Sequence, residues 1–230
     1  MAFNELNSVE HYIIHELSGT NLNADNVREI SGPRSHKWIF KSSSNIKRES
    51  TQVLVETELR DALIRLNPDI NADPKKADEV IYKLRAILLS VNETGLVKAN
   101  EEFIAWMTGE KSLPFGENNR YVPINLIDFD NPSNNSYVVT NQFSIHNRET
   151  KRPDVVLMIN GIPVVVGEAK TPIKPSISWL DGALEINEIY ENAVPQLFVP
   201  NILSFATEGK HLFYGAVRCP LEFWAPWRLE

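Results

Sequence analysis

The spacing of apolar residues changes near the middle of this chain. In the first half, apolar residues recur every three or four positions, which is the period of a helix that buries one face. Prolines and small polar residues at the ends of these segments are typical of helix caps. The pattern predicts helices over residues 6–17, about 51–66, from Asp73-Pro74 onward and about 95–107, the last with Phe103, Trp106 and Met107 in the core and Gly109 after its end.

From about residue 121 onward, short apolar runs and turn residues indicate strands. Asn160-Gly161 separates two β-branched runs and predicts a hairpin with a type I′ turn, because both residues tolerate a positive φ. The pattern predicts a strand over 121–127 with 137–145 as its partner, hairpin strands 155–159 and 162–166, a helix over 178–193 that packs Leu180, Leu184, Ile189 and Tyr190 on the sheet and stops at Pro195, and closing strands 203–206 and 211–217.

These elements predict an α/β (α+β) fold, in which a mixed central sheet is flanked by helices and follows an α-rich N-terminal part. We expect an N-terminal helix and a polar, partly basic extension over residues 1–48, followed by one main domain over residues 49–230. The helical segment at about 73–109 is expected to be an insertion in that domain.

The predicted hairpin gathers three charged residues at one end. Asp154 opens the first strand, and Glu168-Ala169-Lys170 closes the second, with Glu168 and Lys170 on the same face because side chains alternate along a strand. Two carboxylates, with the carbonyl of Ala169, are the oxygen ligands that Mg²⁺ prefers. A lysine beside such an ion could position a water or neutralise charge on a phosphodiester. The spacing therefore predicts a metal-dependent nuclease site.

Other readings of these charged patterns remain open. A charged pair at a strand end is commonly an exposed salt bridge that contributes little. His11 and His15 lie four positions apart on the first predicted helix, but no further ligand follows at a suitable spacing, so we expect surface histidines.

The sequence around the hairpin resembles a known family. The matching runs are 128–143 with Asp-Asn-Pro and Asn-Gln-Phe, 152–157 with Pro-Asp, and 160–170 with Glu-Ala-Lys, with weaker similarity at 53–68, 77–85 and 213–216. They are similar to the N-terminal nuclease domain of the R subunit of type I restriction endonucleases, a branch of the PD-(D/E)xK nuclease superfamily. This resemblance covers roughly residues 50–227. It implies Mg²⁺-dependent cleavage of double-stranded DNA, with Mn²⁺ as a possible substitute, fuelled by an ATP-driven motor region elsewhere in the subunit.

The resemblance also implies roles for individual residues. Asp154 and Glu168 match the metal ligands, Lys170 matches the catalytic lysine, and Glu56 is expected to face the metal from the first helix of the nuclease domain, with Glu58 as its rival. Tyr190 matches the tyrosine of a Gln-x-x-x-Tyr element.

The chain departs from the family pattern at three positions. Ile186 occupies the position of the glutamine, and Gln196, beyond the tyrosine, cannot replace it. Gly167 and Ala169 stand where the family usually has bulky aliphatic residues. These departures put the role of Tyr190 in doubt but remove no metal ligand.

The charge of the chain predicts weak DNA affinity of its own. The net charge is −7, whereas DNA-binding domains are usually basic. One segment, residues 33–48, is basic and free of acidic residues. We expect it to contact DNA phosphates or, alternatively, to be a solvated loop; its basic residues are Arg34, Lys37, Lys41, Lys47 and Arg48.

Composition favours a cytoplasmic protein without a membrane span. The chain has 230 residues and 43% hydrophobic residues, its single cysteine is Cys219, and its first residues do not form a signal peptide. No P-loop motif is present, so ATP is expected to act only through a motor region outside this chain. We expect a fragment that ends about where that motor would begin.

The sequence therefore predicts a Mg²⁺-dependent endonuclease domain of a type I R subunit. Its expected partners are double-stranded DNA, the motor region of the same subunit, and the methylase and specificity subunits. The alternative is a non-catalytic docking module with a degenerate nuclease fold, and a weaker option is a DNA-end-processing exonuclease that uses the same residues.

Overall fold

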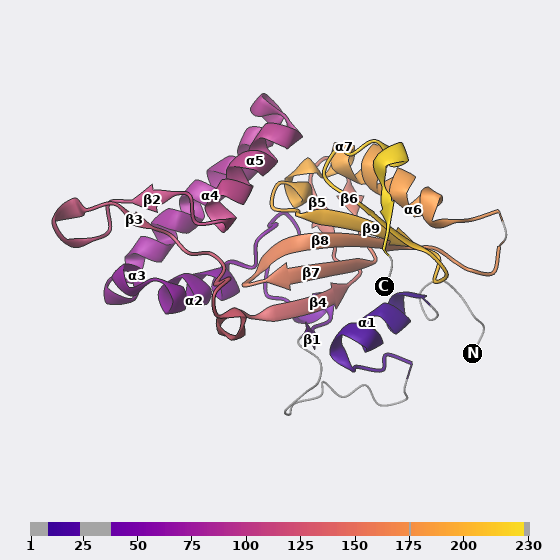
Figure 1. Ribbon diagram of the computed structural model, residues 1–230, viewed down its shortest axis with the longest axis horizontal. Coiled ribbons are helices and arrows are strands. Elements are labelled where there is room, and N and C mark those ends of the chain that lie inside the picture. The colour runs from indigo at the N-terminus through magenta and orange to yellow at the C-terminus, as the bar shows by residue number, and fades with distance from the viewer. Residues whose placement is uncertain (1–8, 24–37, 175, 228–230) are drawn as a thin grey trace.

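The computed structural model describes residues 9–23, 38–174 and 176–227. At its centre lies a seven-stranded mixed sheet with the order β1-β4-β7-β8-β9-β10-β11 (Figure 1). Strand β1 pairs in parallel with β4, and β8 with β9, whereas the other neighbours are antiparallel. The strands are β1 (Ile39–Phe40), β4 (Tyr137–Asn141), β7 (Val155–Ile159), β8 (Ile162–Ala169), β9 (Leu203–Thr207), β10 (Leu212–Gly215) and β11 (Ala225–Pro226). The predicted mixed sheet is confirmed.

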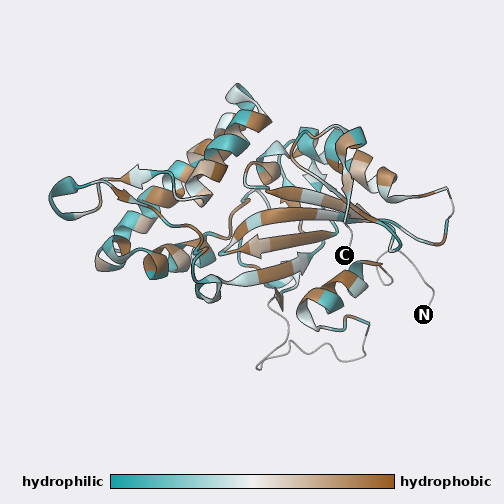
Figure 2. Cartoon of the chain, in the orientation of Figure 1, coloured by the Kyte–Doolittle hydropathy of each residue, from teal (hydrophilic) through white to brown (hydrophobic). Residues whose placement is uncertain are grey.

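Helices cover both faces of this sheet. On one face, α1 (His11–Ser18) places Ile14 in a buried cluster with Val139 and Val155. On the other face, a long helical segment begins with α6 (Trp179–Leu184) and packs over β8 and β9. The sheet between these two layers is coloured mostly as hydrophobic in Figure 2, as expected for strands buried on both faces.

The β7–β8 hairpin has the predicted type I′ turn. Asn160 and Gly161 have φ angles of 52° and 77°. The fully buried Asn160 side chain donates to Leu126 O at 2.8 Å and accepts from Ser136 N at 2.9 Å, so it links the turn to two other segments. We call this end of the hairpin the turn end, and the end with Asp154 and Glu168 the open end.

A helical arm extends from the turn end, on the left of Figure 1. It contains α2 (Glu56–Leu66), α3 (Pro68–Ala72), α4 (Lys75–Thr94) and α5 (Leu96–Met107), and a small sheet of β2 (Ser112–Leu113) and β3 (Val122–Pro123). Helix α2 begins later than predicted because Val53 and Val55 lie buried before it, and Val55 N donates to Gly161 O at 2.9 Å. The predicted core positions of α5 and the positive φ of Gly109 are confirmed.

The predicted pairing of strands 121–127 and 137–145 is wrong. Only Val122–Pro123 forms a strand in the first segment, and it pairs with β2. Residues 124–127 are mostly buried, as their apolar pattern indicated, but side-chain amides take the place of a strand partner: Asn67 bonds both backbone groups of Asn125, and Asn160 bonds Leu126 O. In the second segment, β4 pairs with β1 and β7, and β5 (Ile145–His146) pairs separately with β6 (Thr150–Lys151).

The helix predicted over residues 178–193 exists, but it presents a different face to the sheet. After α6 comes a π-helical turn (Glu185–Tyr190) and then α7 (Glu191–Ala193). Gly182 faces the sheet, where a Cβ would lie 3.2 Å from Ala206 Cβ. This close approach admits only small residues, so the predicted packing of three apolar residues is wrong: Leu180, Leu184 and Ile189 are exposed, whereas Tyr190 is buried as predicted.

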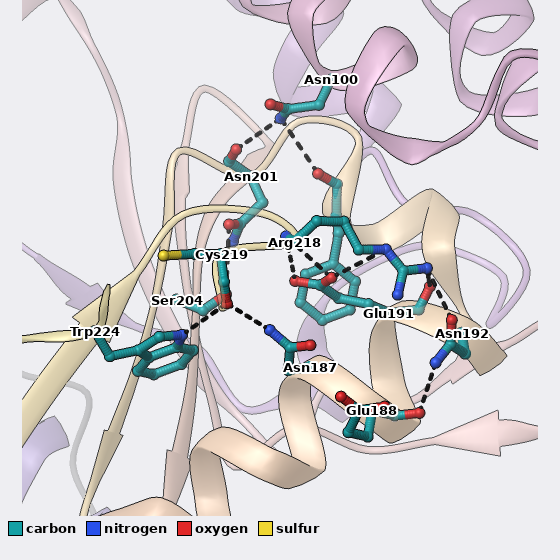
Figure 3. A network of polar contacts seen from close by, with 11 residues as sticks. Asn100, Asn187, Glu188, Glu191, Asn192, Asn201, Ser204, Arg218, Cys219 and Trp224 are labelled. Atoms are coloured by element: carbon teal, nitrogen blue, oxygen red, sulfur yellow. Dashed lines mark hydrogen bonds and ion pairs between the residues drawn. The ribbon is translucent and has the colours of Figure 1, made fainter. Parts of the chain in front are cut away.

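A polar network ties the end of this helix to the segment between β10 and β11, and the arm to the segment before β9 (Figure 3). Glu191 is 1% exposed and pairs with Arg218, with 3.4 Å between Oε2 and Nε. Burial raises the pKa of Glu191 to about 7, although Arg218 opposes that rise. Asn100 of α5 donates to Asn201 O at 2.8 Å. The network therefore joins segments that are far apart in the sequence.

Replacing Gly161 by alanine should destabilise the fold strongly, because an added Cβ would lie 2.5 Å from Val55 O. Gly109 is a matched control, with φ +76° and only an ordinary contact at 3.6 Å. We expect Gly161→Ala to lower the free energy of unfolding by about 1–3 kcal/mol more than Gly109→Ala does. Urea denaturation of both variants measures the difference, and equal losses would contradict the tight approach of α2 to the turn.

Candidate active site

The open end of the hairpin brings together the three charged residues that the sequence singled out. Asp154 immediately precedes β7, and its Oδ2 accepts a hydrogen bond from Ala169 N at 2.9 Å, across the strand pair. Lys170 Nζ donates to Glu168 Oε1 at 2.9 Å, so both side chains share one face of β8. Lys170 is itself fixed by its backbone N–H, which donates to Thr207 O at 2.8 Å. The site lies at the sheet edge near α1 and α6 (Figure 1).

The surroundings of the two carboxyl groups disfavour their charged forms. Burial, with the nearby charge of Asp154, raises the pKa of Glu168 to about 9, and burial also raises the pKa of Asp154. Among the described residues, the buried Glu168 Oε2 has no hydrogen-bond partner. A hard divalent cation would supply both the missing charge and the missing partner.

This donor set fits Mg²⁺ better than a metal enclosed by many side chains. No cluster of three or more His, Cys, Asp or Glu side chains in the described part of the chain could hold a metal ion. The available ligands are the carboxylates of Asp154 and Glu168 and the carbonyl of Ala169. Mg²⁺ commonly binds through one or two carboxylates and completes its octahedron with water and substrate phosphate.

Lys170 lies between two carboxylates. Besides Glu168, its Nζ contacts Glu185 Oε2 at 2.5 Å, and Glu185 Oε1 accepts from the hydroxyl of Tyr190 at 2.9 Å. Burial acts to lower the pKa of Lys170, but the two carboxylates outweigh it, and the net pKa is raised. Burial and the same carboxylates raise the pKa of Tyr190. Lys170 therefore remains a cation and Tyr190 a neutral hydrogen-bond donor at neutral pH.

The π-helical turn determines which side chain lies beside Tyr190. A π turn contains one residue more than an α turn, so the side chain that lies beside Tyr190 is five positions before it, not four. That residue is Glu185, whereas Ile186 is fully buried in the core. Glu185, and not Ile186, is therefore the residue of this helix that contacts the Tyr190 hydroxyl. Sequence spacing gave no signal for this shift.

The acidic residues expected on α2 do not reach the open end. The helix begins beside Gly161, and Glu168 lies seven positions along β8 from that glycine, a span of about 23 Å. Glu56 pairs with Arg85, and Glu58 pairs with Lys41 at 2.6 Å. The prediction that Glu56 or Glu58 faces the metal is therefore wrong.

A different helix supplies an acid to the site. Glu10, immediately before α1, is 1% exposed and accepts from Asn141 Nδ2 at 2.8 Å and Gln142 Nε2 at 2.7 Å. The same Gln142 amide donates to Asp154 Oδ1 at 2.9 Å. Burial raises the pKa of Glu10 to about 7. The amphipathic pattern located this helix, but nothing in the spacing connected Glu10 with residues more than a hundred positions away.

The basic segment 33–48 does not form a continuous phosphate-binding strip. Arg34 and Lys37 lie outside the described residues, and Lys41 pairs with Glu58. Arg48 is directed inward: it lies 3.6 Å over the ring of Phe143 and donates to Gln52 O at 2.7 Å. Lys47 is exposed, so among the described basic residues of this segment it is best placed to contact a DNA phosphate.

Two other sequence features have structural explanations. The Cβ that Gly167 lacks would lie 2.1 Å from Phe205 Cζ, so the Phe205 ring of β9 fills the space that an aliphatic residue would occupy. His15 is exposed, and His11 Nδ1 bonds Asn23 Oδ1 at 2.7 Å, as expected for surface histidines.

Comparison with known proteins identifies the family. The family described as type I restriction enzyme R protein N terminus matches residues 3–223. The chain belongs to this family. Its relatives include the type I restriction enzyme HindI endonuclease subunit of Haemophilus influenzae, which is 28% identical over 181 residues, or 77% of this chain and 16% of that protein.

A second relative is the putative type I restriction enzyme MjaIXP endonuclease subunit of Methanocaldococcus jannaschii, 25% identical over 207 residues, which cover 85% of this chain and 19% of the relative. This R-protein N-terminal chain therefore spans less than one fifth of either protein. No helix in the described ranges is long and apolar enough to cross a bilayer.

Substitutions of Glu10 and Glu56 should have different effects on metal binding. We expect Glu10→Gln to weaken Mn²⁺ binding by about tenfold, because Glu10 shares the Gln142 amide with Asp154. Glu56→Gln should leave the affinity unchanged, because Glu56 lies at the turn end. Isothermal titration calorimetry measures both, and weaker binding by the Glu56 variant alone would contradict this geometry.

Metal affinity should also depend on pH. Because the pKa of Glu168 is raised to about 9, this carboxyl carries a proton at pH 7 that a cation must displace. Apparent Mn²⁺ affinity should therefore rise between pH 6 and pH 8 by up to about tenfold per pH unit, with about one proton released per ion. Calorimetry in buffers with different ionisation enthalpies counts these protons. An affinity that does not change with pH in this range would show that the pKa of Glu168 is not raised.

Proposed function

We propose that this chain is a Mg²⁺-dependent endonuclease domain that cleaves phosphodiester bonds of double-stranded DNA within a type I restriction enzyme. The observation that carries this proposal is the convergence of Asp154, Glu168 and Lys170 at one sheet edge, where Glu168 Oε2 is buried without a described partner. The relatives are named endonuclease subunits, which supports the same activity.

Asp154, Glu168 and the carbonyl of Ala169 are the groups that would hold Mg²⁺, or Mn²⁺ in its place. A bound divalent cation would polarise the scissile phosphate and lower the pKa of a nearby water. The chain's own contribution is to keep both carboxylates in position: Ala169 N and the Gln142 amide each hold one oxygen of Asp154.

Lys170 acts as a cation and not as a base, because its raised pKa keeps it protonated. Its ammonium group donates hydrogen bonds that orient the attacking water and offset the charge that develops on the phosphate. Glu185 aims this group, and Tyr190 holds Glu185 in turn. Solvent then protonates the leaving 3′ oxygen.

The remainder of a type I assembly would supply what this chain lacks. ATP would be used only by a motor region, since this sequence has no P-loop. The net charge is −7, and Lys41 and Arg48 are engaged in internal contacts, so the motor, methylase and specificity subunits would provide most of the hold on DNA. Such an assembly would work in the cytoplasm.

One observation favours the alternative of a non-catalytic docking module. Lys170 is held by the carboxylate of Glu185 as well as by Glu168, so an additional negative charge competes for the lysine. Binding of Mg²⁺ or Mn²⁺ that depends on Asp154 supports the nuclease; absence of any such binding supports the docking module.

Lys170→Ala should abolish DNA nicking without loss of the fold, with a decrease of at least about 100-fold in the assembled enzyme. Lys174→Ala is a matched control, because Lys174 is exposed four residues further on, and it should cleave normally. The assay follows conversion of supercoiled plasmid to nicked and linear forms. Undiminished cleavage by the Lys170 variant would refute the mechanism.

A further inference from the structure

Gln142 occupies an unusual position beside the two acids of the open end. It directly follows β4 and has φ +51°, in the left-handed region that non-glycine residues adopt at a cost. Its backbone N–H donates to Asp154 O at 3.0 Å, and the next N–H, that of the fully buried Phe143, donates to Pro153 O at 3.2 Å. The surrounding structure therefore holds this backbone conformation in place.

The unusual backbone directs the side chain between two carboxylates. Nε2 donates to Asp154 Oδ1 at 2.9 Å and to Glu10 Oε2 at 2.7 Å. A primary amide has two N–H donors on one nitrogen, so each donor serves one acid. The opposite amide orientation would turn a carbonyl oxygen toward both negative groups, so the contacts also fix which way the amide points.

The other oxygens of both acids are held by different partners. Asp154 Oδ2 accepts from Ala169 N, and Glu10 Oε1 accepts from Asn141 Nδ2. Each carboxylate oxygen can accept more than one contact, so these bonds orient the acids without occupying every lone pair. Removing the Gln142 amide would take away the one group that Asp154 and Glu10 share and would leave two like charges facing each other.

We propose that Gln142 is a positioning residue that fixes Asp154 and Glu10 in the arrangement that receives a divalent cation. This inference rests on the proposed metal-dependent function. Gln142 need not touch the cation or DNA; it acts by orienting a ligand and by separating two negative charges. Partners that orient metal ligands commonly contribute a factor of about 10–100 to metal affinity.

The structure offers a substitution that removes the amide and keeps the backbone. Glycine adopts positive φ readily, so Gln142→Gly should keep the turn after β4. Gln142→Asn is a second variant: asparagine also tolerates this region, but its amide is one methylene shorter and cannot reach both acids. Gln196→Ala is the control glutamine, because it lies beside Glu56 and Arg85, away from the open end.

The experiment is calorimetric titration of the chain with Mn²⁺ alone, combined with thermal melting. We expect Gln142→Gly and Gln142→Asn to weaken Mn²⁺ binding by about 10-fold to 100-fold with melting temperatures close to that of the wild type, and Gln196→Ala to bind normally. Saturating Mn²⁺ should restore nicking by the assembled Gln142 variants, because the catalytic groups are intact.

Unchanged Mn²⁺ affinity in folded Gln142→Gly would overturn the inference. Loss of the fold in both Gln142 variants would also overturn it, because Gln142 would then have a purely structural role. The variant Asp154→Asn distinguishes failure of the positioning role from failure of the proposed function. If that variant loses Mn²⁺ binding while Gln142→Gly binds normally, only the positioning role fails. If Asp154→Asn binds as tightly as the wild type, the proposed metal site itself fails.

Discussion

Burial of two carboxyl groups at the open end of the β7–β8 hairpin is the constraint on which the rest of the site depends. Burial removes Asp154 and Glu168 from water, and the ammonium group of Lys170, which pairs with Glu168, is shared with Glu185. Such an arrangement costs folding stability unless a proton or a cation neutralises it. In the proposed function, a bound divalent cation would reduce this cost by neutralising the two carboxylates.

Contacts with other segments hold both ends of the hairpin in place. At the turn end, Asn160 and Gly161 bring Ile159 opposite Ile162; a bulge between Leu157 and Met158 then shifts the register by one residue, so that Val155 lies opposite Gly167 and the Asp154 side chain reaches Ala169 N. At the open end, Gln142 and Glu185 hold the acids and the lysine from outside the hairpin. The site thus combines a local hairpin with contacts from three distant segments: Glu10 before α1, Gln142 after β4 and Glu185 in the π-helical turn.

The sequence predicted the local part of this arrangement and missed the distant part. Asp154, Glu168 and Lys170 could be found because they lie on one hairpin, where alternation along the strand and the turn dipeptide decide which side chains meet. Glu56 was misplaced because the extended segment before α2 runs along the sheet and delivers the helix to the turn end. Glu10 and Glu185 were missed because their roles depend on tertiary packing and on a one-residue change in helical period, neither of which leaves a spacing signal.

The interlocking of Gly167 with the Phe205 ring has a consequence for how this family can vary. The two residues are paired across neighbouring strands and share a single volume, so neither can be exchanged freely while the other is retained. An aliphatic side chain at the position before Glu168 requires a smaller residue on β9, and an aromatic residue on β9 requires a glycine before Glu168. The two positions should therefore covary among homologues, with intermediates that carry a large residue at both positions selected against.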